Sequence, residues 1–141
     1  MPVTFQILPH RGLVYVRYEG FLSLDETMAA FGAYLQHPDC RPGQKQLIDL
    51  AGVTDFERDF AKLFAVQARK LDVFARDGAE TLIVYHAPSD LGLAMSKTIL
   101  MSWEPFEGVV PRIQDTEADA LALLGQPETS FRDLLHHADK V

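Results

Sequence analysis

Several features are scarce in this 141-residue sequence, and each absence narrows the choice of function. A single cysteine, Cys40, excludes an internal disulfide. No apolar run is long enough for a membrane span. The 13 Lys and Arg are scattered among 20 Asp and Glu, and the net charge of -7 argues against nucleic acid, which needs concentrated positive charge. The first residues lack the segments of a secretion signal, so we expect a soluble cytoplasmic protein.

What the sequence does contain is enough apolar material, 48% of its residues, for one core. Alternating apolar and polar residues predict an antiparallel hairpin of two strands. Continuous apolar runs predict two buried strands, and Pro111 places a short last strand at a sheet edge. Helical spacing predicts four helices between these segments. The expected strands are 3–8, 13–19, 47–50, 81–85 and 109–113, and the expected helices are 23–37, 55–77, 91–103 and 116–124.

This order of elements predicts an α/β fold with a mixed sheet of about five strands and helices packed mainly on one face. We expect a domain over residues 1–125. Residues 126–141 are expected to form a C-terminal helical extension whose apolar side includes Phe131 and Leu135. Asp55 is the expected N-cap of the second helix, which should be about 30 Å long and project beyond the sheet with Val66, Val73 and Phe74.

Four stretches in order resemble a known family. They are VRYEGFLS at 16–23, HPDCRPG at 37–43, LIDLAGVT at 47–54 and DTEADALALLG at 115–125. These stretches are similar to those of the SpoIIAA-like proteins of the STAS/SEC14-like group. The resemblance covers about residues 3 to 125. It implies a non-enzymatic binding or regulatory module that acts through protein-protein association, with lipid or small apolar ligand binding as the SEC14-like alternative.

The resemblance also implies a switch that can be checked residue by residue. In anti-sigma-factor antagonists an Asp-Leu-Ser-Gly-like turn precedes a phosphorylated Ser or Thr at a helix start. Asp49 and Gly52 match the turn, whereas Ala51 replaces its serine. Thr54 is the nearest hydroxyl, and beside Asp55 and other acids a phosphate there would meet repulsion. A lost or replaced switch is therefore the expectation.

Other candidate residues lie where the two buried strands end. Asp49 and His86 end neighbouring strands and Ser89 follows His86, so a weak hydrolase is a further alternative. No Gly-x-Ser-x-Gly elbow supports it. The bland interpretation is that Asp49 fixes its own turn and Ser89 caps a helix. His136 and His137 point apart on a helix, so we expect no metal, and no cofactor is expected.

Apolar residues support two further expectations. Leu93, Leu100 and Met101 fall outside the inner stripe of their helix and predict a partner surface, which we expect to form a homodimer. The projecting end of the second helix and the tail residues Phe131 and Leu135 are expected to add to this apolar surface. Gln67 lies in the middle of an apolar helix face, where it either bonds a loop or reaches into a pocket. The alternative to a partner surface is an apolar pocket that involves Tyr85, Met95 and Trp103.

Overall fold

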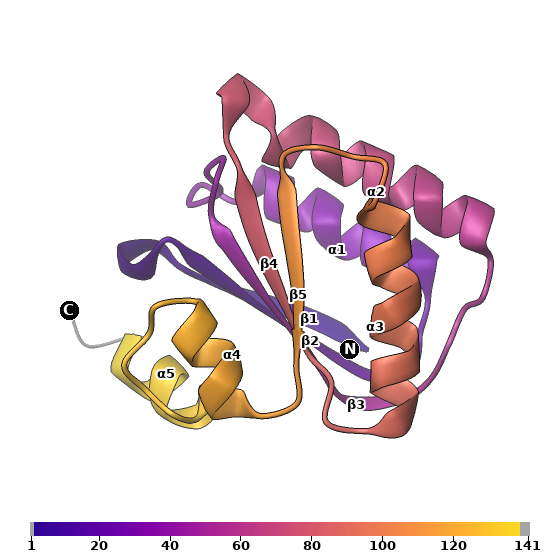
Figure 1. Cartoon of the computed structure of the whole chain (residues 1–141). Coiled ribbons are helices and arrows are strands. Elements are labelled where there is room, and N and C mark those ends of the chain that lie inside the picture. Colours follow the sequence, from indigo (N-terminus) through magenta and orange to yellow (C-terminus); the bar gives the residue numbers. More distant parts are fainter. Residues whose placement is uncertain (1, 139–141) are drawn as a thin grey trace.

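Five strands form one mixed sheet in the computed structural model, which describes residues 2–138 of the chain. Their order is β1-β2-β3-β4-β5; β1 and β2 are antiparallel and all other neighbours are parallel (Figure 1). The predicted α/β fold with a mixed five-stranded sheet is confirmed. The elements are β1 Val3–Leu8, the 3-10 helix η1 Pro9–Arg11, β2 Leu13–Leu22, α1 Leu24–Gln36, β3 Lys45–Phe56, α2 Phe60–Phe74, η2 Arg76–Gly78, β4 Thr81–His86, α3 Asp90–Trp103, β5 Val109–Gln114, α4 Glu117–Leu123 and α5 Phe131–Ala138.

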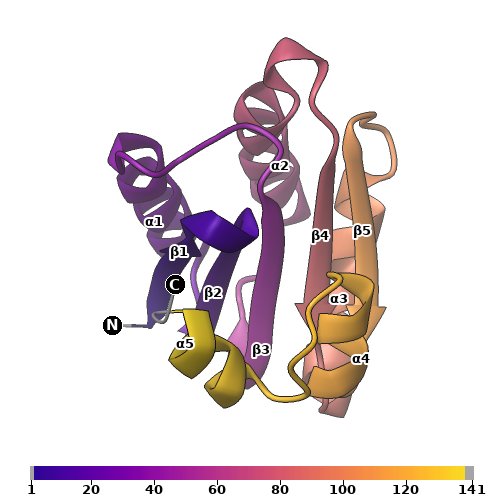
Figure 2. The same cartoon turned by 90° about the vertical axis from the view of Figure 1, so that its left-hand side faces the viewer.

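Three of the helices cover the same face of the sheet. From β2 to β5 each strand is connected to its parallel neighbour by a helix, and right-handed crossovers made in one direction place these three connecting helices on one side (Figures 1 and 2). The alternate side chains of the strands that point to this side form the larger core with α1, α2 and α3. Its strand residues include Val14, Tyr18, Leu50, Ile83 and Tyr85.

The opposite face is covered by α4 and α5. Leu13, Tyr15, Leu47 and Val84 point to this side and pack with residues of both helices. Phe131 of α5 is 5% exposed. The expectation that Phe131 adds to an apolar surface is therefore wrong, because the second face of the sheet needs its own cover. The proposed domain division at residue 125 stays a prediction.

A charged pair fastens the start of this C-terminal segment to the hairpin. Arg11 donates from Nη1 and Nη2 to Glu128 Oε1 and Oε2, at 2.8 and 2.9 Å. The Arg11 guanidinium holds the pKa of Glu128 well below its usual range, at about 2. The pair ties residues 117 positions apart, so the segment before α5 is fixed at both the sheet and the hairpin turn.

The strand that begins with the LIDL stretch is longer than expected. β3 continues past Gly52 to Phe56 because β2 is also long, and Leu22 pairs with Phe56. A side-chain Cβ at Gly52 would lie 3.1 Å from the carbonyl oxygen of Tyr18, so the close approach of β2 and β3 at this position favours glycine. The expected cap Asp55 lies within the strand, and Asp59 caps α2 instead by accepting from Lys62 N at 3.0 Å.

The second helix is correspondingly shorter than predicted. α2 ends at Phe74, and at about 1.5 Å per residue its 15 residues span about 22 Å. Val66 and Phe74 are buried, so the expectation that they project from the domain is wrong. Ser23 and Thr116 do cap α1 and α4 as residue patterns predict, and Pro111 lies in the edge strand β5.

Candidate functional site

The two parallel strands β3 and β4 bring Asp49 and His86 together, as predicted. The residues are register partners, and His86 Nδ1 lies 3.0 Å from Asp49 Oδ1. Tyr15 donates its hydroxyl to Asp49 Oδ2 at 2.6 Å, and Ala51 N donates to Oδ1 at 3.1 Å. An ionised carboxylate only accepts, so the His86 nitrogen is the donor in its bond.

This cluster is closed and satisfied. Asp49, His86 and Tyr15 are all buried. The rings of His86 and Phe131 are nearly perpendicular, with their centroids 4.9 Å apart. Burial alone would raise the pKa of Asp49, but the hydrogen bonds from His86, Tyr15 and Ala51 outweigh it and hold the pKa below its ordinary value. The arrangement joins the middle of β3 to the last residue of β4 beneath α5 and presents no open face to a ligand.

Ser89 takes no part in that network. Its Oγ accepts from Gly92 N at 3.0 Å and so caps α3. Among the described residues no hydrogen bond joins Ser89 to His86. The structure therefore assembles two of the three groups of the imagined Ser-His-Asp arrangement, and gives the serine the capping role that the bland interpretation assigns to it.

The proposed switch residues lie further along β3. Thr54 and Asp55 are exposed, and α2 begins only at Phe60. Asp55 Oδ1 accepts from Phe56 N at 2.9 Å and pairs with Arg58 at 2.8 Å, and the Phe56 N–H and Arg58 hold the pKa of Asp55 below its usual value. A phosphate on Thr54 would thus lie away from a helix N-terminus, beside an arginine that already has a partner.

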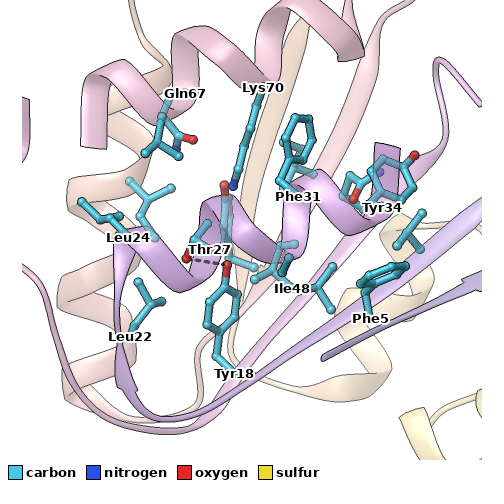
Figure 3. A pocket seen from close by; sticks show the side chains of 18 of the residues that line it. Phe5, Tyr18, Leu22, Leu24, Thr27, Phe31, Tyr34, Ile48, Gln67 and Lys70 are labelled. Atoms are coloured by element: carbon cyan, nitrogen blue, oxygen red, sulfur yellow. Dashed lines mark hydrogen bonds between the residues drawn. The ribbon is translucent and has the colours of Figure 1, made fainter. Parts of the chain in front are cut away.

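An apolar pocket lies elsewhere, between α1, α2 and the sheet. It encloses about 80 Å³, and Figure 3 shows its side chains converging from both helices and from the strands. Of the three residues predicted for a pocket, only Tyr85 lines this one. Met95 and Trp103 are buried behind it, and Trp103 Nε1 donates to the Tyr85 hydroxyl at 2.9 Å.

The lining is mostly aliphatic and aromatic. Its polar members come from β2, α1, β3, β4 and, most notably, from α2. The residues are Phe5, Val14, Val16, Tyr18, Leu22, Leu24, Thr27, Ala30, Phe31, Tyr34, Gln46, Ile48, Leu50, Leu63, Val66, Gln67, Lys70, Phe74, Ile83, Tyr85 and Ile99.

Two polar side chains of α2 stand out in this setting. Gln67 is 1% exposed and does reach the pocket, one of the two roles predicted for it. Lys70 follows one turn later and extends from α2 toward Tyr18 and Thr27 (Figure 3). Burial lowers the pKa of Lys70 to about 8. Lys70 was missed from the sequence, although its spacing from Leu63, Val66 and Phe74 places it on the buried stripe.

The predicted partner surface is exposed in part. Leu93 and Met101 of α3 are 38% and 59% exposed, and Leu100 is half-buried. Helical spacing also predicts that Phe60 and Phe64 of α2 lie on the same inner face as Phe74, but both are exposed. That prediction is wrong because α2 buries the stripe of Val66, Gln67 and Phe74, and Phe60 and Phe64 lie to the side of it.

Among the described side chains, those of residues 2–138 except Asp77, no three His, Cys, Asp or Glu gather in a way that could hold a metal ion. None of the helices that the structure describes is both long and apolar enough to cross a membrane. No family model matches the sequence, and no curated protein is similar enough to count as a relative.

Proposed function

We propose that this protein is a non-enzymatic binding module for a small apolar molecule, held between α1, α2 and the sheet. The observation that carries the proposal is the pocket itself. Protein interiors are close-packed, and a space lined by aliphatic and aromatic side chains with a few converging polar groups is typical of a ligand site. The SEC14-like side of the sequence resemblance leads to the same expectation.

Size restricts the ligand class. The pocket of about 80 Å³ is smaller than an apolar cavity of about 150 Å³ that accepts benzene, so the bound group has only a few carbon atoms unless the helices move apart. A longer molecule would keep part of its chain outside, between α1 and α2. A panel of short-chain and medium-chain compounds is therefore the appropriate probe.

The test has two parts: detection of a bound ligand, and a substitution that fills the pocket. Native mass spectrometry of the purified protein and thermal-shift measurements with the panel should show a bound mass or a rise in Tm. Ala30→Leu places three extra carbon atoms in the pocket, and Ala29→Leu makes the same change on the exposed side of α1. Binding should disappear in the first variant and persist in the second. Absence of any bound mass or shift, or equal binding by both variants, would refute the proposal.

We also propose that two copies of the chain associate through α3. This proposal is supported by the exposure of Leu93 and Met101 on one helix. Light scattering coupled to size exclusion should give a dimer for the natural chain and a monomer for Met101→Glu. Leu123→Glu, on the exposed side of α4, is the matched control and should remain dimeric. A strict monomer at high concentration would contradict the proposal.

A further inference from the structure

One positive charge faces the apolar pocket. Lys70 is the single ionisable cation or anion among the lining side chains apart from the phenols. Figure 3 shows its side chain running down from α2, with the nitrogen inside the ring formed by the lining residues. Among the side chains that the structure describes, those of residues 2–138 except Asp77, none forms a hydrogen bond or an ion pair with the Lys70 ammonium.

The other lysine of α2, Lys62, has the carboxylate partners that Lys70 lacks. Lys62 pairs with Asp25 at 3.0 Å and with Glu57 at 3.1 Å, and these carboxylates raise its pKa. Lys70 has the opposite pKa shift, caused by burial alone. A half-buried ammonium without a partner loses part of its hydration, and a carboxylate partner offsets much of that cost. No acid of the described chain supplies one to Lys70, so the partner is expected from outside.

Gln67 provides a second, independent observation. Its Nε2 donates to Ser102 Oγ at 3.1 Å, while its buried Oε1 has no partner among the described residues. Ser102 already donates to the carbonyl oxygen of Ile99 at 2.5 Å, so its oxygen must accept from Gln67. This chain of bonds fixes the amide orientation and leaves Oε1 free. In Figure 3 that oxygen points toward the Lys70 side of the pocket.

The two unsatisfied groups lie one helical turn apart and mark one end of the pocket as polar. Resting on the function proposed above, we propose that the ligand is a small apolar monocarboxylic acid whose carboxylate pairs with Lys70. An ammonium has three hydrogens, so in the complex Lys70 has donors for both the ligand carboxylate and Gln67 Oε1, a bond that the ligand-free structure does not form. The apolar body then lies among Phe5, Phe31 and Ile48.

The count of donors favours a carboxylate over a phosphate. A phosphate carries more negative charge and more acceptor oxygens, and it is usually held by several cations or by a helix N-terminus. The lining contains one ammonium and no arginine. A single monoanion matches that supply.

The test compares ligands of the same body and different heads. Hexanoate, hexanol and hexylamine, whose chain ends would extend out of the small pocket between α1 and α2, are titrated at pH 7 into the natural chain, Lys70→Met and Lys97→Met, with Trp103 fluorescence and calorimetry as readouts. Lys97 is exposed on α3 and serves as the matched control. The natural chain and Lys97→Met should bind hexanoate roughly 10- to 100-fold more tightly than hexanol, as a charge-assisted hydrogen bond allows, and hexylamine most weakly. Lys70→Met should lose the preference and still bind hexanol.

Each outcome decides a different statement. Equal binding of hexanoate and hexanol by the natural chain overturns the role of Lys70 and leaves the apolar site in place. Failure of the natural chain to bind any of these compounds, or the longer acids of the panel, overturns the proposed function itself. Should Lys70→Met fail to fold, the order of the three ligands on the natural chain and on Lys70→Gln still decides the inference.

Discussion

Replacing Lys70 by methionine should stabilise the protein in the absence of ligand. Burial lowers the pKa of Lys70 from its ordinary 10.5 to about 8. At about 1.4 kcal/mol per pKa unit, this difference corresponds to a penalty of about 3 kcal/mol for the charged form in the folded state. The side chain is half-buried rather than fully enclosed, so water reduces the penalty, and we expect about 1–3 kcal/mol. Methionine has a similar length and no charge.

The sign of the pH dependence provides a stricter test. The pKa of Lys70 in the folded state lies below that of the unfolded chain, so between about pH 8 and 10.5 the unfolded chain holds more protons. The free energy of unfolding of the natural chain therefore gains from Lys70 as the pH rises through this window. The variant lacks this gain, so its advantage should be largest below pH 8 and should disappear above 10.5.

Urea unfolding of both proteins at pH 7 and pH 10.5, at one ionic strength, measures the effect. Other groups titrate equally in the two proteins, and their contributions cancel in the difference. Lys97→Met, an exposed lysine on α3, should change the free energy of unfolding little at either pH. A Lys70→Met variant that is no more stable at pH 7, or an advantage that does not change with pH, would refute the reasoning.

Three further substitutions test other parts of the structure. Tyr15→Phe removes a donor from a buried carboxylate and should cost about 1.5–3 kcal/mol in urea unfolding at pH 7. The loss should shrink as the pH falls below the ordinary pKa of Asp49, 3.8, and a loss independent of pH would contradict this role. Phe131→Ala should cost about 3–5 kcal/mol in calorimetry, and a change near zero would show that α5 does not complete the core. Asp59→Ala should cost about 1 kcal/mol as the loss of the α2 cap, whereas Asp55→Ala should cost less, and the reverse order would return the helix start to Asp55.

Local sequence patterns were sufficient to predict the strands, because the number of buried faces of a strand determines its pattern of apolar residues. The alternation in the hairpin and the continuous apolar runs of β3 and β4 specify which strands are half-covered and which are interior, and parallel neighbours follow from the intervening helices. The meeting of Asp49 and His86 could be predicted because the two apolar runs pair as parallel neighbours, although β3 continues past Asp49 to Phe56.

The rest depends on partners that are distant in sequence. β3 extends to Phe56 because the long β2 offers hydrogen bonds there, and this pairing overrides the capping signal of Asp55. The sequence shows that α5 is amphipathic, but it does not show which surface α5 covers. In the structure α5 packs on the face of the sheet that α1, α2 and α3 leave open. The pocket lies beside α1 and α2 rather than α3 because the packing of three helices, and not the stripe of any one, determines where space is left.

The two faces of the sheet differ in how they treat buried polar groups, and this difference decides where function is assigned. On the α5 face the Asp49 carboxylate receives three hydrogen bonds and is sealed by an aromatic ring. On the α1–α2 face the buried amide oxygen of Gln67 has no partner, and the partly exposed Lys70 ammonium has no acidic partner among the described side chains. Unsatisfied groups reduce stability, and natural sequences retain such local violations mainly where a binding site requires them. The contact of Asp49 in β3 with His86 at the end of β4 is therefore structural, and the pocket beside Lys70 is the site to which we assign a ligand.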